Sequence, residues 1–134
     1  MALPALLDGL RVLVLEDEFL IAMDIEQICR DHGASDVTIV DKLDTFDQDA
    51  VSRFGAAIID LTLNGASTLA VAGQLQREGI PFVFASGHPI TEETRLAFPG
   101  VLLVEKPYSG DDLIAALAQA RTAISPQSAG GDIT

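Results

Sequence analysis

The sequence contains little cysteine, few basic residues, no tryptophan and no long apolar run. The single cysteine, Cys29, excludes an internal disulfide framework and favours a reducing compartment. No apolar run approaches the roughly 20 residues that a helix needs to cross a bilayer. The first residues include no basic stretch of the kind that begins a signal peptide. These absences together predict a cytoplasmic protein.

The scarcity of basic residues makes the chain strongly acidic, with 8 Lys and Arg against 20 Asp and Glu and a net charge of −12. Such a charge repels the phosphates of nucleic acids and anionic lipids, so we expect neither a nucleic-acid partner nor a membrane partner. It favours a protein that binds cations or basic protein surfaces. Acidity that serves only solubility explains the charge equally well.

The length of 134 residues allows one domain with a substantial core. We expect an N-terminal arm over residues 1–9, a domain over residues 10–124 and a disordered tail over residues 125–134, which is rich in Ser, Gly and Pro.

Apolar segments alternate with segments of helical periodicity along this domain. Strands are predicted over residues 11–15, 36–40, 56–59, 80–85 and 101–104, and helices over residues 18–32, 42–53, 67–78, 91–97 and 109–124. The alternation predicts an α/β fold with a parallel sheet covered by helices on both faces.

Polar residues follow four of the five predicted strands. Glu16 and Asp17 follow the first strand, Asp60 the third, Ser86 the fourth and Lys106 the fifth. Because ligands of open parallel sheets bind at the carboxyl ends of the strands, we expect these side chains to converge there.

The predicted cluster has the chemistry of a phosphate site. Crowded carboxylates repel one another and need a cation, and Mg²⁺ prefers such oxygen ligands. Lys106 adds a fixed positive charge, and the hydroxyl of Ser86 can hydrogen-bond a phosphoryl oxygen. Asp60 is the candidate nucleophile toward phosphorus, because phosphoryl transfer needs mainly positioning and neutralised charge.

The motifs that carry these residues resemble those of receiver domains in two-component response regulators, of the stand-alone single-domain type. The matching segments are Val14-Leu-Glu16-Asp17-Glu, Ile58-Ile-Asp60-Leu, Phe84-Ala-Ser86-Gly and Glu105-Lys106-Pro107-Tyr108. The resemblance covers about residues 10–124. It implies a flavodoxin-like, doubly wound five-stranded parallel sheet in the order 2-1-3-4-5, flanked by five helices.

The resemblance also implies roles for individual residues. Asp60 is the expected phosphoacceptor, and the expected Mg²⁺ ligands are Asp17, Asp60 and the carbonyl of Thr62, with Glu16 acting mostly through water. Ser86 is the expected switch hydroxyl and Lys106 the phosphate-binding lysine. The expected donor is a phosphohistidine on a sensor histidine kinase or a histidine phosphotransfer protein.

One position departs from the family pattern, and two others flank the predicted site. Leu103 stands where the family often has an aromatic residue that moves on activation. Thr62 and His88 are candidate modulators of water access to the phosphoryl group, although a solvated loop residue explains His88 equally well. Output is expected to pass to a downstream partner protein near the fourth and fifth strands, where Phe98, Val101 and Tyr108 are apolar.

Other functions remain open from the sequence. The same module can serve as a phosphate sink or an unphosphorylated adaptor in a phosphorelay. A Mg²⁺-dependent phosphatase is disfavoured because Thr62 occupies the position of the second aspartate that such hydrolases usually have. A flavin-binding module ranks last, because no phosphate-cradling glycine loop follows the first strand. We therefore expect a signalling domain that catalyses at most its own phosphorylation and dephosphorylation.

Overall fold

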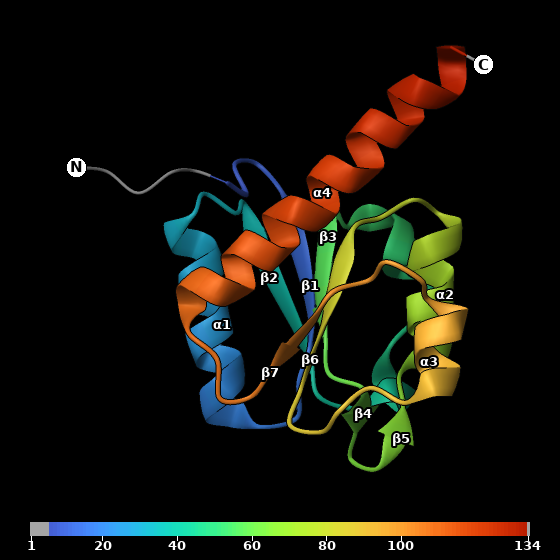
Figure 1. The fold of residues 1–134 in the computed structure, drawn as a ribbon. Coiled ribbons are helices and arrows are strands. Elements are labelled where there is room, and N and C mark those ends of the chain that lie inside the picture. Colours follow the sequence, from blue (N-terminus) through green and yellow to red (C-terminus); the bar gives the residue numbers. More distant parts are fainter. Residues whose placement is uncertain (1–5, 134) are drawn as a thin grey trace.

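The structure is a computed structural model that describes residues 6–133, and the side chains of residues 6–122. Figure 1 shows a central sheet with helices on both sides. The helices are α1 (Phe19–Asp31), η1 (Leu43–Thr45), η2 (Gln48–Arg53), α2 (Leu69–Arg77), α3 (Glu92–Ala97) and α4 (Gly110–Ile133). The strands are β1 (Arg11–Leu15), β2 (Asp36–Val40), β3 (Ala56–Ile59), β4 (Thr62–Leu63), β5 (Ala66–Ser67), β6 (Phe82–Ser86) and β7 (Leu103–Glu105).

The main sheet has five parallel strands in the order β2-β1-β3-β6-β7. Because β4 and β5 form a separate hairpin, this order is the predicted 2-1-3-4-5 arrangement, and the flavodoxin-like α/β fold is confirmed. All loops that leave the carboxyl ends of the strands lie at the lower edge in Figure 1. This carboxyl edge holds the residues that the sequence singles out.

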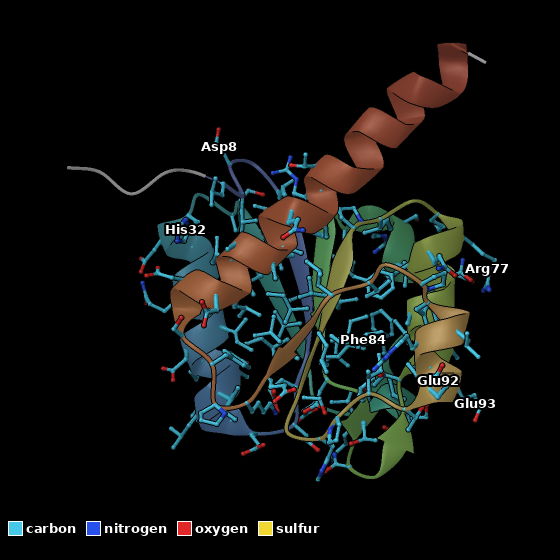
Figure 2. The ribbon with its side chains drawn as sticks, in the orientation of Figure 1. Asp8, His32, Arg77, Phe84, Glu92 and Glu93 are labelled. Atoms are coloured by element: carbon cyan, nitrogen blue, oxygen red, sulfur yellow. The ribbon has the colours of Figure 1, made fainter. Side chains whose placement is uncertain are left out.

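Two apolar cores lie on opposite faces of the sheet, because successive strand side chains alternate between the faces. Leu13, Ile59 and Phe84 pack toward η2 and α2, whereas Val14, Ile58 and Val83 pack toward α1 and α4. Figure 2 shows Phe84 in the interior, on the side of α2 and α3. Burial on both faces explains why the strands read as continuous apolar runs. Cys29 is buried in the α1 core, and burial raises the pKa of its thiol to about 12.

The segment predicted as one helix over residues 42–53 forms two short 3₁₀ helices, η1 and η2. The carboxylate of Asp47 accepts a hydrogen bond from the amide of Asp49 at 2.9 Å, which starts a new helix in the middle of the segment. Acidic residues at such positions favour caps and turns over helix interiors. Val51 still packs into the core, so the apolar pattern identifies the buried residues but not the type of helix.

The β4–β5 hairpin was not predicted. It connects β3 to α2 through a turn at Asn64 and Gly65, whose φ angles are +49° and +83°. Positive φ at both central residues defines the turn for which an Asn-Gly pair is the strongest sequence signal. The flanking strands have two residues each, too few for an alternating pattern to be visible.

The described residues include parts of the predicted arm and of the predicted tail. Leu7, within the predicted arm, is fully buried, and its amide donates to the carbonyl of His32 at 2.9 Å. Residues 1–5 of that arm lie outside the described residues. At the other end, α4 runs to Ile133 and extends beyond the sheet in Figure 1; disorder over residues 125–134 stays a prediction. Within residues 6–133, no helix is both long and apolar enough to cross a membrane.

Candidate functional site

Three predicted residues meet at the carboxyl edge of the sheet. The Nζ atom of Lys106 lies 2.8 Å from Oε1 of Glu16 and 2.8 Å from Oδ2 of Asp60. Glu16 is 2% exposed and Asp60 is 9% exposed, so two carboxylates and one ammonium share a nearly dry location. Buried charges persist only when they are paired in this way.

Backbone hydrogen bonds between neighbouring strands fix these three residues. The amide of Glu16 donates to the carbonyl of Val40 at 3.1 Å, and the amide of Asp60 donates to the carbonyl of Leu15 at 2.9 Å. The amide of Lys106 donates to the carbonyl of Ser86 at 2.8 Å, and the Lys106–Pro107 peptide bond is cis. The sheet therefore continues far enough beyond its apolar strands to position the charged side chains.

Burial and pairing act in opposite directions on the pKa values of the site. Burial raises the pKa of Glu16 above its usual value, although the hydrogen bond from Lys106 opposes the shift. Burial by itself lowers the pKa of Lys106, but the hydrogen bonds to Asp60 and Glu16 outweigh it and raise that pKa overall. Lys106 is therefore a fixed cation over the whole physiological pH range.

A group of three carboxylates shares Glu16 with this cluster. Glu16, Asp17 and Glu18 each offer one oxygen, and these oxygens lie within 4.8 Å of one another. A set composed only of carboxylate oxygens has the chemistry that Mg²⁺ requires, so the residues fit the predicted ion. Asp60 is not part of this group, and Glu18, which sequence reasoning did not select, is part of it.

Backbone amides of the segment that follows Asp60 donate hydrogen bonds to two carboxylates of the site, Asp60 and Asp17. The amide of Thr62 donates to Oδ1 of Asp60 at 3.4 Å, while the Thr62 side chain is exposed. Oδ2 of Asp17 accepts a hydrogen bond from the amide of Asn64 at 2.7 Å. Thr62 thus lies next to the predicted phosphoacceptor, and its carbonyl remains a predicted metal ligand.

The opposite half of the carboxyl edge contains Ser86 and His88. The hydroxyl of Ser86 is buried and accepts a hydrogen bond from the amide of His88 at 3.2 Å. His88 itself is exposed, with Gly87 and Pro89 on either side. Ser86 joins the site through the backbone of Lys106, whereas no described contact joins the His88 side chain to the carboxylates.

The apolar residues around this half differ in their accessibility. Leu103, on β7, is partly buried against the core on the α2 side. Phe98 is only 6% exposed and packs edge-on against Phe82 and Phe84, so the expectation that it contributes to a partner surface is wrong. Among the side chains that the structure describes, the large exposed apolar ones are instead Leu96 on α3, Phe19, Leu20 and Met23 on α1, and Leu6.

Sequence reasoning did not place three neighbours in the site, although it named Tyr108 as an apolar residue of the output face. Oε1 of Glu18 lies 3.4 Å from the Nζ atom of Lys106, and Asn64 holds Asp17. The Tyr108 hydroxyl is buried and has no hydrogen-bond partner among the described residues; burial, then the charge of Glu16, raises its pKa to about 12. The Asn-Gly pair was the available signal for Asn64, whereas the positions of Glu18 and Tyr108 depend on loop conformations that no periodicity encodes.

Comparisons with known proteins place this geometry in a context. No protein-family model matches the chain, and no curated protein matches it. Among solved structures, it is similar to the anti-anti-sigma factor PhyR from Bartonella quintana, with 27% identity over 92% of this chain and a TM-score of 0.69. The chain covers 51% of that protein, about half its length.

Two further structures match over most of both chains. The receiver domain of PhyR from Erythrobacter litoralis is 26% identical, with 86% of this chain and 92% of that chain covered and a TM-score of 0.64. A response regulator receiver protein from Sinorhizobium medicae WSM419 is 23% identical, with coverages of 88% and 98% and a TM-score of 0.70, a likeness of fold alone. Together with the strand order, these similarities support a receiver domain of the response regulator family.

Proposed function

We propose that this receiver domain accepts a phosphoryl group on Asp60 and passes the signal to a partner protein by a local conformational change. One observation carries the proposal: the ammonium of Lys106 lies 2.8 Å from both Asp60 and Glu16 at the carboxyl edge. A carboxylate that is buried, paired with a cation and still 9% exposed can react with an incoming phosphoryl group.

The chemical step is a substitution at phosphorus. A carboxylate oxygen of Asp60 forms a bond to the phosphorus of a phosphohistidine, the phosphorus–nitrogen bond breaks, and the nitrogen keeps the electron pair. The product is an acyl phosphate. Lys106 neutralises charge that gathers on the phosphoryl oxygens, and the amide of Thr62, 3.4 Å from Oδ1 of Asp60, orients the carboxylate.

Magnesium would be held by Asp17, Asp60 and the carbonyl of Thr62, with Glu16 acting mostly through water. The oxygen group of Glu16, Asp17 and Glu18 supports this assignment because it supplies hard ligands, and its member Glu16 shares the Lys106 ammonium with Asp60. When bound, the ion supplies charge neutralisation for the phosphoryl oxygens. Glu18 extends the acidic group to the beginning of α1.

The response to phosphorylation is proposed to begin at Lys106 and Ser86. A phosphoryl group adds about −2 of charge at neutral pH. Lys106 would then exchange its contacts with Asp60 and Glu16 for the phosphoryl oxygens, and the hydroxyl of Ser86 would turn from the amide of His88 toward the same oxygens. Because the Ser86 backbone is bonded to Lys106, both changes act on the loop that leads into α3.

Exposed apolar residues near the site support protein partners on both sides of this step. Phe19 and Leu20 are 73% and 76% exposed at the beginning of α1, directly after the acidic group. Such a patch suits a phosphohistidine-bearing kinase or phosphotransfer protein, whose histidine must reach Asp60. Leu96, exposed on α3, suits a downstream partner that detects the change in the neighbouring loop.

The experiment that tests this function uses a small-molecule donor, so that no cognate kinase is required. Incubation with acetyl phosphate and Mg²⁺ is expected to add one phosphoryl group, detected by mass spectrometry of the intact chain and mapped to Asp60. Asp60→Asn is expected to abolish the adduct completely. The matched control, Asp44→Asn, changes an exposed acid of η1 and is expected to retain full labelling.

The switch is read separately with beryllofluoride and Mg²⁺ by backbone resonances of residues 86–106. Shifts in the unsubstituted chain that vanish in Asp60→Asn would support the switch. Absence of both the adduct and the shifts in the unsubstituted chain would refute the phosphoacceptor function and favour an unphosphorylated adaptor. An adduct without shifts would favour a phosphate sink.

A further inference from the structure

The β4–β5 hairpin contacts the predicted metal ligand from outside the acidic group. The amide of Asn64 donates to Oδ2 of Asp17 at 2.7 Å, across 47 positions of sequence. The same residue's side-chain amide donates through Nδ2 to the carbonyl of Asp41 at 3.0 Å, just beyond β2. Asn64 therefore links the segment that follows β3 to the ends of both β1 and β2.

The backbone conformation of the hairpin allows Asn64 to make both hydrogen bonds. Asn64 has a φ of +49°, a left-handed conformation that Asn tolerates better than most residues with a side chain. The base of the hairpin is held near Asp60, because the Thr68 hydroxyl donates to the carbonyl of Asp60 at 2.6 Å. The tip of the hairpin is held only at Asp17 and Asp41 among the described side-chain contacts.

We propose that Asn64 is a positioning residue that fixes the Asp17 carboxylate for a divalent cation, with the Asp41 carbonyl as its anchor. The hydrogen bond from the Asn64 amide to Oδ2 restrains the orientation of the Asp17 carboxylate, which also offers an oxygen to the acidic group of Glu16, Asp17 and Glu18. Residues that orient metal ligands in this way typically contribute tenfold or more to metal affinity. The inference rests on the metal site of the proposed function and names a residue outside the predicted ligand set.

The test compares two glycine substitutions in the same hairpin. Asn64→Gly retains the left-handed backbone and the amide that bonds Asp17, but it removes the anchor to Asp41. Ala66→Gly adds similar backbone freedom in β5, with no anchor removed. Isothermal titration with MgCl₂, without any phosphoryl donor, is expected to show a dissociation constant raised on the order of tenfold in Asn64→Gly and within about twofold of the parent in Ala66→Gly.

Three further measurements separate positioning from a general structural effect. Urea unfolding without Mg²⁺ is expected to give both variants the same small loss of stability. Amide hydrogen exchange at position 64 is expected to quicken in Asn64→Gly, because the anchor no longer keeps the amide against Asp17. Labelling by acetyl phosphate is expected to return to the parental rate in Asn64→Gly at saturating Mg²⁺.

The results that would overturn the inference are distinct from those that would refute the proposed function. Equal Mg²⁺ affinities in Asn64→Gly and Ala66→Gly, or no measurable Mg²⁺ binding by the unsubstituted chain, would overturn the role of Asn64. A labelling defect that saturating Mg²⁺ does not repair would do so as well. A third outcome is also distinct: Asn64→Gly binds Mg²⁺ more weakly than the unsubstituted chain, but the unsubstituted chain accepts no phosphoryl group. That result would refute the phosphoacceptor function and leave the role of Asn64 intact.

Discussion

The carboxyl edge has an acidic half, with Asp17, Asp60 and Lys106, and a second half that begins at Ser86. The two halves differ in how firmly their residues are held. In the acidic half, Lys106 bonds to Glu16 and Asp60 at 2.8 Å, and the hairpin is tied to Asp17. In the other half, the loop from Gly87 to Thr91 is mostly exposed and leads into a helix of only six residues, α3. Figure 2 shows Glu92 and Glu93 at the end of α3 that lies nearer this edge.

This difference matches what each half would do in a phosphorylation switch. A reacting group benefits from fixed charges that need no rearrangement at the moment of transfer. A responding segment must have a low cost of movement, and few buried contacts provide that low cost. Ser86 belongs to both halves, because its backbone is bonded to Lys106 and its hydroxyl to the amide of His88.

The largest effect on this comparison is expected from removing the cation of the acidic half. Lys106→Met leaves Glu16 and Asp60 buried without a counter-charge, a change that typically costs about 3 kcal/mol of folding free energy. The loss, measured by urea unfolding, is expected at pH 8 and is expected to shrink at pH 5, where Glu16 can take up a proton. Lys106→Arg retains the charge and serves as the control. Equal losses at both pH values would contradict the pairing described here.

A smaller effect is expected from removing one of the paired acids. Burial raises the pKa of Glu16 above its unfolded value, so the folded state holds a proton on this group more tightly. The stability that this provides is complete below about pH 4.5 and is lost as the pH rises through the raised pKa. Glu16→Gln cannot show this loss.

Urea unfolding of both proteins from pH 4 to pH 8 checks the prediction. The stability of Glu16→Gln relative to the parent is expected to increase with pH across this window and then to level off, by about 1.4 kcal/mol for each unit by which the pKa is raised. Parallel pH profiles would show that Glu16 titrates as an ordinary exposed acid. Glu16→Gln also loses one contact to Lys106. This loss shifts the whole curve of stability against pH and leaves its slope unchanged.

The acidic half was easier to predict than the other features of this edge. Asp60 directly follows an apolar strand and Lys106 follows another after a single residue, Glu105, so strand periodicity and parallel topology are enough to bring them together. The predicted bounds of helices and strands are wrong where local hydrogen bonds set the conformation. Asp47 caps η2 and so divides the predicted helix over residues 42–53. The Asn64–Gly65 turn forms an unpredicted hairpin from strands of two residues each. An apolar side chain such as that of Phe98 can lie either in the core or in a partner surface, and the sequence does not distinguish the two. Its packing against Phe82 and Phe84 places it in the core.

The smallest effect on stability is expected at the residue that joins the two halves. Ser86→Ala removes the acceptor of the His88 amide, while the backbone bond from Lys106 remains. Because the loop is exposed and water can replace the lost partner, the cost is expected to be about 1 kcal/mol. Labelling of Asp60 by acetyl phosphate is expected to continue, since Ser86 does not contact the Asp60 carboxylate. The beryllofluoride-induced shifts in residues 87–98 are expected to diminish, whereas those near Glu16 persist. Ser86→Thr retains the hydroxyl and is expected to restore the shifts. If Ser86→Ala left the shifts in residues 87–98 unchanged, the two halves would communicate through the Lys106 backbone alone, and the hydroxyl would have no part in the switch.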